Sequence, residues 1–230
     1  MDKHKSLLSL FQIIDSFFPS GAFAYSWGLE TYVSEGSIKE RSGLKRFLEA
    51  YLSGTIKRCD ALLVKLSHEA AEKGDIDTIF RLDRLIHSMK LAREPREGSI
   101  QIGRQLLNVM MGLHKSNLLE HLAEGISNGK ALGHHPVVFG IVCSVIENSK
   151  DEAVTAYLYQ TVAGIVSAGL RLIPLGHMDG QRVIEEIKLL IIKIVDDVSL
   201  LNEDDISAFA PGIEIRAMRH EHLYTRLFKA

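Results

Sequence analysis

The fold of this chain is best predicted from residues 154–172, which read VTAYLYQTVAGIVSAGLRL. Apolar or small residues recur there at the three- and four-residue spacing of an α-helix, at Val154, Tyr157, Leu158, Val162, Ile165, Val166 and Gly169. Pro174 and Gly176 follow this stretch and would end such a helix. Because apolar residues also lie on both sides of the stripe, the pattern predicts a long helix that is central and largely buried.

The same stretch raises the question of a membrane span, because residues 153–170 carry no charge and are borderline in length for crossing a bilayer. Polar side chains such as Gln160 interrupt the run, and Arg171 follows it directly. These residues favour the core helix of a soluble protein. Gly164 and Ala168 lie four positions apart, which predicts that a neighbouring helix approaches closely there.

Helix signals also occur on both sides of this stretch. Ser37 and Glu40 have the pattern of a capping box, and Asp75 has the character of a second N-cap. Pro95 and Pro136 suit the first turns of two further helices. No segment shows the alternation of a strand and no linker divides the chain. We therefore predict a single all-α domain, residues 1–230, with about nine or ten helices.

Composition limits the class of function. Of the 230 residues, 46% are hydrophobic and 24% are charged, and the net charge is −2. An ordinary folded protein has such a composition, and no broad basic field for nucleic acid is indicated. Cys59 and Cys143 lie far apart and in no metal-binding pattern, which is typical of reduced thiols in the cytosol.

The N-terminus imitates a secretory signal, because Lys3 and Lys5 precede an apolar run over residues 7–14. Gln12 and Asp15 interrupt the pattern. We therefore interpret the run as a short amphipathic helix.

The compact motifs of common enzymes are absent from the sequence. It has no GxxxxGK[ST], GxGxxG, GxSxG or HExxH, so no phosphate loop, nucleophile elbow or compact zinc site is indicated. We predict no enzyme activity and no cofactor. His134 and His135 form at most half of a metal site, to be completed across an interface, and His220 and His222 point to different sides of a helix.

Residues 203–230 differ in character from the rest. Three acids at residues 203–205 and an Ala-Pro-Gly break at residues 210–212 precede a basic helix predicted over residues 213–228. Its candidate anchors are Leu223, Tyr224, Leu227 and Phe228, with Arg216, Arg219 and Arg226. Tyrosine and arginine are enriched at binding hot spots, so we predict a C-terminal docking segment over residues 203–230. The alternative is that the apolar residues pack back on the bundle.

Three blocks are more specialised than a helical scaffold requires. Residues 15–30 read DSFFPSGAFAYSWGLE, residues 171–182 read RLIPLGHMDGQR, and residues 218–228 read MRHEHLYTRLF. Together with GRQLL at residues 103–107, these blocks resemble the UreF family of urease accessory proteins, and the resemblance covers nearly the whole chain.

The resemblance implies an all-α, dimeric, cytoplasmic protein without nucleotide hydrolysis of its own. It implies an adaptor and regulator that joins a second accessory protein, UreD (also called UreH), and the GTPase UreG on apo-urease, where nickel is inserted. Neither nucleic acid nor a membrane is an expected partner. Three residues depart from those common in the family: Tyr25, His177 and Thr225.

The resemblance and the hot-spot chemistry nominate a set of partner-binding residues: Tyr25, Glu30, Arg171, Gln181, Arg182, Arg216, Arg219, His220, Tyr224 and Arg226. Glu30 ends the first block and is the candidate contact of the GTPase. The large apolar residues of that block are expected in the core, namely Phe17, Phe18, Phe23 and Leu29. One alternative is a direct nickel carrier with histidine donors, namely His134, His135, His177, His220 and His222. The other is a helical enzyme whose cleft the sequence does not reveal.

Overall fold

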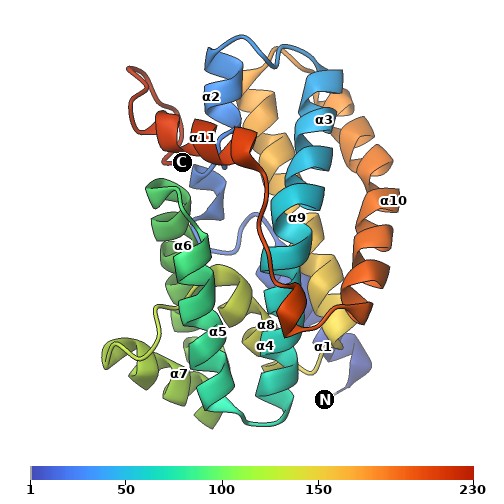
Figure 1. Ribbon diagram of the computed structural model, residues 1–230. Coiled ribbons are helices and arrows are strands. Elements are labelled where there is room, and N and C mark those ends of the chain that lie inside the picture. The colour runs from blue at the N-terminus through green and yellow to red at the C-terminus, as the bar shows by residue number, and fades with distance from the viewer. Residues whose placement is uncertain (1) are drawn as a thin grey trace.

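The computed structural model describes residues 2–230, and these fold into a helical bundle without a β-strand (Figure 1). The α-helices are α1 (Lys3–Ile14), α2 (Leu29–Ser34), α3 (Arg41–Tyr51), α4 (Leu62–Glu72), α5 (Ile76–Met89), α6 (Arg93–Leu113), α7 (Asn117–Ser127), α8 (His135–Val145), α9 (Lys150–Leu172), α10 (His177–Leu200) and α11 (Pro211–His220). A π-helical segment, η2 (Leu52–Ala61), joins α3 to α4, and the short 3₁₀ turns are η1 (Ala22–Ala24) and η3 (Glu203–Asp205). Because α3 and α4 form one rod, the described residues contain 10 separate helices, and the all-α prediction is confirmed.

Helix α9 occupies the centre of the bundle and packs against α4, α8 and α10 (Figure 1). A capping box starts it, because Ser149 Oγ accepts the Glu152 N–H at 3.2 Å and the Glu152 carboxylate accepts the Ser149 N–H at 2.8 Å. It ends at Leu172, before Pro174, as predicted. By length and composition α9 is the one described helix that could cross a membrane, but 56% of its most apolar window is buried inside the bundle. The interpretation as a core helix is confirmed.

One face of α9 is not covered by the rest of the chain. No atom of a neighbouring helix lies within 4 Å of the position that a Cβ would take at Gly164, so the close helix approach predicted there is wrong within the single chain. The close approach occurs instead at Gly169, where an added Cβ would lie 2.7 Å from Leu44 Cδ2 of α3. Ala168, the other residue of the predicted close approach, is fully buried.

The predicted capping box at Ser37 is wrong. Helix α3 begins at Arg41, and Glu40 takes the N-cap position. The N–H groups of Ser37 and Ile38 donate to the Tyr32 carbonyl at the end of α2, at 2.9 and 3.3 Å. Because Ile38 is also buried, residues 37 and 38 close the end of α2 and do not start α3.

Three other predicted helix starts are confirmed. Asp75 caps α5, since its Oδ1 accepts the Thr78 N–H at 3.0 Å. Pro95 and Pro136 lie in the first turns of α6 and α8, where a missing N–H costs no helical hydrogen bond.

The chain crosses back over the bundle before it ends. Residues 206–210 run along η2, and the Phe209 N–H donates to the Gly54 carbonyl at 2.9 Å. Helix α11 then packs on α2 and α6 (Figure 1). Its buried residues are Ile213, Ala217 and His220. This packing brings the end of the chain beside the first specialised block.

Candidate protein-binding site

A tight turn at the end of the first block starts helix α2. Trp27 and Gly28 both have positive φ, of 56° and 88°, a conformation that glycine adopts without penalty. A Cβ added to Gly28 would lie 3.4 Å from the backbone nitrogen of Ala217 in α11. Gly28 therefore lets the backbone of α11 lie directly on the turn, and the site forms where α2, α6 and α11 meet.

Glu30, in the first turn of α2, is buried at this junction, with 6% of the residue exposed. Its Oε2 lies 2.9 Å from His220 Nε2 and accepts the Phe228 N–H at 3.0 Å. Its Oε1 accepts the Leu227 N–H at 2.6 Å. The carboxylate thus holds both α11 and the end of the chain, and it can reach a partner protein only if these C-terminal residues move.

Glu94 of α6 lies on the other side of the same imidazole. Its Oε2 is 2.6 Å from His220 Nδ1, and its Oε1 accepts from Arg226 Nη1 at 2.7 Å. The side chains of His220 and Glu94 are only 0% and 11% exposed. Buried charges are stable only when they are paired, and here the Glu94 carboxylate pairs with Arg226 and contacts His220, which also contacts Glu30. We refer to Glu30, His220 and Glu94 as the carboxylate–histidine cluster.

Residues 221–230, called the C-terminal tail below, lie against the first block along one edge. The Lys229 N–H donates to the Ala24 carbonyl at 2.8 Å, and the Trp27 N–H donates to the Ala230 carbonyl at 3.1 Å. Ala230 is buried, with 1% exposed. The inner edge of the tail is therefore fixed by backbone hydrogen bonds as well as by Glu30.

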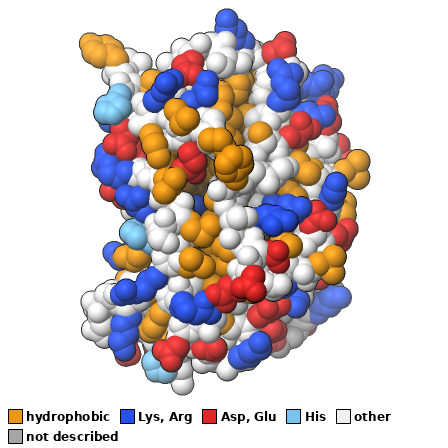
Figure 2. Space-filling view, in the orientation of Figure 1, with side chains coloured by type: hydrophobic (Ala, Val, Ile, Leu, Met, Phe, Trp, Pro, Cys, Tyr) orange, Lys and Arg blue, Asp and Glu red, His pale blue; other side chains and the backbone are white. Residues whose placement is uncertain are grey.

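The outer face of the tail is open to solvent. Tyr224 is fully exposed and Leu227 is 61% exposed, whereas Phe228 is buried. Figure 2 shows exposed hydrophobic side chains on the face that carries α11, with charged side chains around them. The predicted apolar anchors therefore divide into two groups: Tyr224 and Leu227 are available to a partner, Phe228 packs on the bundle, and Leu223 is half-buried.

The predicted arginines have different surroundings. Arg216 and Arg219 both pair with Glu35, at 2.8 and 3.2 Å. The Arg216 guanidinium also lies over the Tyr32 ring, 4.2 Å from its centre. These contacts fasten α11 to α2 and leave Arg219 the more exposed of the two.

The second block reaches the site only in part. The Arg171 guanidinium lies over the Phe228 ring, and its Nη2 donates to the Phe23 carbonyl at 3.0 Å. Gln181 and Arg182 are exposed on α10, where Arg182 lies 3.7 Å from Asp179. Within residues 2–230 no hydrogen bond or ion pair joins these two to the tail. Of the three residues nominated from this block, Arg171 is thus the one that contacts the C-terminal tail.

Tyr25 supports the turn from inside. It is 5% exposed, its hydroxyl donates to Gln101 Oε1 at 2.9 Å, and its ring stacks on Trp27 with 5.3 Å between centres. Burial raises the pKa of Tyr25, and the nearby Glu97 carboxylate adds to the effect. In this conformation Tyr25 positions the turn and does not offer a surface to a partner.

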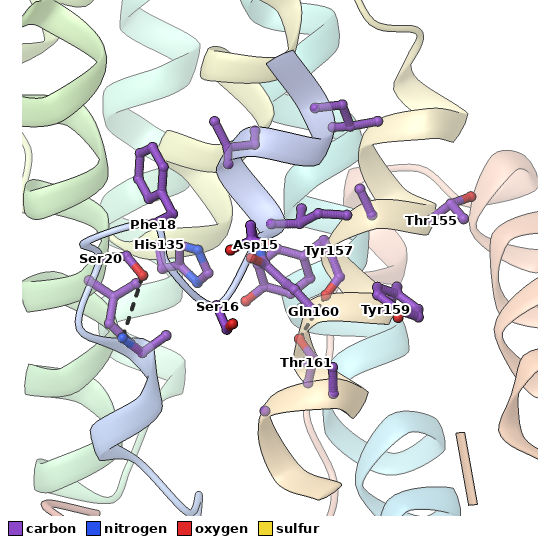
Figure 3. Close-up of a pocket in the computed structure, with 18 of the residues that line it drawn as sticks. Asp15, Ser16, Phe18, Ser20, His135, Thr155, Tyr157, Tyr159, Gln160 and Thr161 are labelled. Carbon is purple, nitrogen blue, oxygen red and sulfur yellow. Dashed lines mark hydrogen bonds between the residues drawn. The ribbon is translucent and has the colours of Figure 1, made fainter. Parts of the chain in front are cut away.

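A groove of about 990 Å³ opens between α1, the loop after it and α9 (Figure 3). Helix α1 is amphipathic as predicted, with Leu10 and Ile13 buried toward the bundle. Phe18 and Leu29 are buried as expected. The same expectation is wrong for Phe17 and Phe23, which are 94% and 69% exposed because the loop turns them outward.

A buried polar cluster at the inner end of the groove was not predicted. Lys90 Nζ lies 3.0 and 3.1 Å from the two Asp60 carboxylate oxygens, and the Tyr157 hydroxyl donates to Asp60 Oδ1 at 3.0 Å. Burial raises the pKa of Tyr157, and Asp60 adds to the effect. Figure 3 shows Tyr157 beside His135 in the groove wall. Because the Asp60 carboxylate is already occupied by two donors, it is not a free general base.

The neighbouring histidines are held in neutral form. Burial, with Lys90 nearby, lowers the pKa of His134 to about 3, and burial lowers that of His135 to about 4. His134 Nε2 lies 3.2 Å from His87 Nδ1. Across residues 2–230, no group of three or more His, Cys, Asp or Glu side chains is arranged to hold a metal ion.

Sequence reasoning did not single out Glu94, Asp60 or Lys90. Glu94 was visible only as an acid near the start of a helix, where it is favourable for the helix dipole. Asp60 closely follows Lys57 and Arg58 and precedes an apolar run over residues 61–64, so the sequence did not mark it as one half of a buried ion pair.

The fold and the site define an all-helical protein whose most specialised surface is suited to contact with another protein. The sequence model of the UreF family matches residues 38–188. A urease accessory protein UreF from Bacillus sp. (strain TB-90) is 38% identical over 222 residues, which cover 96% of this chain and 98% of that protein. Proteins of the same name from Lachnoclostridium phytofermentans and Paenarthrobacter aurescens are 38% and 34% identical, over 96% of this chain and 97% and 96% of their own lengths. The chain belongs to the UreF family of urease accessory proteins.

Proposed function

We propose that this chain is a cytoplasmic adaptor in urease maturation, which joins UreD/UreH and the GTPase UreG on apo-urease for nickel insertion. The observation that carries the proposal is the two-sided C-terminal tail. Its inner edge is held on Glu30, and its outer face presents Tyr224 and Leu227 to solvent. An exposed tyrosine is typical of a binding hot spot, and a fixed backbone favours binding because little conformational freedom is lost.

In this proposal the chain regulates its partners and catalyses no reaction itself. The sequence lacks a phosphate loop, and the buried Asp60 carboxylate is occupied by Lys90 and Tyr157. Burial raises the pKa of the Cys59 and Cys143 thiols, which disfavours the reactive thiolate. GTP hydrolysis is therefore assigned to the partner and not to this chain.

We also propose that the chain forms a homodimer through the groove face of α1 and α9. Apolar side chains are exposed along this face, namely Leu7, Phe11, Phe23 and Tyr159. The open position at Gly164 leaves room for a second copy. Exposed apolar patches of this kind are typical of subunit interfaces.

The adaptor proposal is tested by complementation. A urease operon that lacks its own UreF would be expressed with and without this chain, and urease activity and urease nickel content would be measured. The proposal expects both to rise together, with UreG and UreD/UreH co-purifying with the chain. Activation without any such association would contradict the adaptor role.

Nickel carriage by this chain is the alternative, and exposed His177 and His222 are the donors free to act at an interface. Equilibrium dialysis separates the two functions. Tight stoichiometric nickel binding by the isolated chain would favour the carrier, and its absence favours the adaptor.

A further inference from the structure

The His220 imidazole bridges two carboxylates that come from different helices. Its Nε2 lies 2.9 Å from Glu30 of α2, and its Nδ1 lies 2.6 Å from Glu94 of α6. A neutral imidazole carries one N–H and can donate on one side only. If both carboxylates are ionised, the two-sided contact requires the imidazolium, which donates from both nitrogens.

Each of the two carboxylates contacts both His220 and the C-terminal tail. Glu30 accepts the backbone N–H groups of Leu227 and Phe228, and Glu94 accepts from the Arg226 guanidinium. The tail is therefore bound to α2 and α6 through the same carboxylates that His220 orients.

We propose that His220 and Glu94 are positioning residues of the partner-binding surface. They are buried and do not touch the partner; they fix the tail backbone so that Tyr224 and Leu227 face outward. The inference rests on the proposed function, in which that outer face binds a partner protein. It also assigns Glu30 an indirect role, since its carboxylate acts on the partner through the tail.

The physical reason lies in the charges of the cluster. Without the imidazole that lies between them, the Glu30 and Glu94 carboxylates face each other in a buried site, which is strongly unfavourable. The carboxylates then turn to water and release the backbone N–H groups of Leu227 and Phe228. A tail that samples many conformations must be ordered again on binding, and this ordering weakens the affinity.

A purely structural role makes a different prediction from a positioning role. Glutamine at position 220 offers one N–H₂ group, for Glu30, and one carbonyl, which would face Glu94. In His220→Gln alone, the new side-chain carbonyl therefore faces the Glu94 carboxylate, and neither group can donate a hydrogen bond to the other. Adding Glu94→Gln restores the match. The amide N–H₂ at position 94 donates to the side-chain carbonyl at position 220, while the amide oxygen at position 94 still accepts from Arg226. If the two residues position the tail, the double variant should hold the tail and capture the partner better than His220→Gln alone does. If each substitution damages the structure independently, the double variant should do both less well.

The experiment compares the full chain with His220→Gln, Glu94→Gln and the double variant. His121→Gln is the matched control, because His121 is exposed on α7. Two measurements are made: hydrogen exchange of the Leu227 and Phe228 amides in the isolated chain, and capture of purified UreD/UreH. The backbone N–H of Trp27, the single tryptophan, donates to the Ala230 carbonyl. Tryptophan fluorescence therefore also reports release of the tail.

We expect His220→Gln to raise the exchange rate of the two amides and to weaken capture, each by about tenfold or more. The double variant should recover part of both losses, and His121→Gln should change neither. Should His220→Gln fail to fold, Glu94→Gln carries the test, with a smaller loss of both readouts. Faster exchange with capture unchanged would overturn the positioning role, as would a double variant weaker than His220→Gln. Failure of the unaltered chain to capture UreD/UreH would instead contradict the proposed function, whatever the exchange rates show.

Discussion

The Arg171 guanidinium lies 4.4 Å from the centre of the Phe228 ring. This contact joins the end of the central helix α9 to the C-terminal tail, and the same guanidinium donates to the Phe23 carbonyl. Three segments that are far apart in the sequence therefore meet at one side chain.

Arg171→Ala is expected to loosen the tail without unfolding the bundle. Cation–π contacts at exposed sites contribute about 0.5–1 kcal/mol. The Phe228 amide should then exchange about two- to fivefold faster. Arg171→Lys should retain part of the effect, and Arg46→Ala on α3 is the matched control. Equal exchange rates in all four proteins would show that the contact does not hold the tail.

Lys90→Met is expected to lower the free energy of unfolding far more than a surface substitution does. The Lys90 and Asp60 side chains are 11% and 4% exposed, so removal of the cation leaves a buried carboxylate without its partner. The free energy of unfolding should fall by about 3–5 kcal/mol in urea titrations.

Two variants control this prediction. Lys188→Met breaks an exposed pair with Glu185 and should cost less than about 1 kcal/mol. Lys90→Met combined with Asp60→Asn should cost less than Lys90→Met alone, because the buried charge is gone. A loss below about 1 kcal/mol for Lys90→Met itself would be incompatible with a buried, paired Asp60.

His134 makes stability depend on pH in the acid range. Burial lowers its pKa from 6.5 to about 3, so between these values the unfolded chain binds a proton that the folded chain does not. The stabilisation is complete above pH 6.5 and is lost as pH falls toward 3. His134→Gln should flatten the fall in the free energy of unfolding between pH 6 and 4.5 by about 1.4 kcal/mol per pH unit at most. An unchanged slope, equal to that of His121→Gln, would contradict a buried neutral His134.

Gly164→Lys tests the proposed homodimer. The position is open within the chain, and lysine favours a helix more than glycine does, so the monomer should stay folded. A charged side chain on the groove face should disrupt the dimer, with the mass measured by light scattering halved at micromolar concentration. Gly112→Lys on α6, which is equally open, should leave the mass unchanged. A dimer that survives Gly164→Lys would place the interface elsewhere.

The fold was largely predictable because local signals decide it. Pro174 and Gly176 marked the end of the central helix, and Asp75 and Pro136 marked two helix starts. The helix start predicted at Ser37 was wrong because a capping pattern is a local signal, whereas the burial of Ile38 depends on tertiary packing. The close approach predicted at Gly164 was wrong within the chain because a small residue leaves room for a neighbouring helix. The residue does not indicate whether that helix belongs to the same chain.

The site was predictable in its parts but not in its arrangement. The first and third blocks contain Glu30, His220 and Arg226, which the structure brings together. Glu94 lies outside all three blocks, and nothing in a single sequence indicates that α6 passes beside α11. Which apolar residues of the tail face inward also depends on that packing, so Phe228 and Tyr224 were not distinguishable from sequence.

The outer face of the C-terminal tail is tested most directly by the affinity of this chain for purified UreD/UreH, measured by titration calorimetry. Tyr224→Ala combined with Leu227→Ala removes two exposed side chains and should leave the melting temperature unchanged. We predict that it weakens binding by at least about 2 kcal/mol, or roughly thirtyfold. Leu200→Ala removes another exposed leucine, at the end of α10, which is 85% exposed compared with 61% for Leu227. This control should bind like the unaltered chain. Binding by the Tyr224 and Leu227 variant that equals that of the unaltered chain would contradict the assignment of this face.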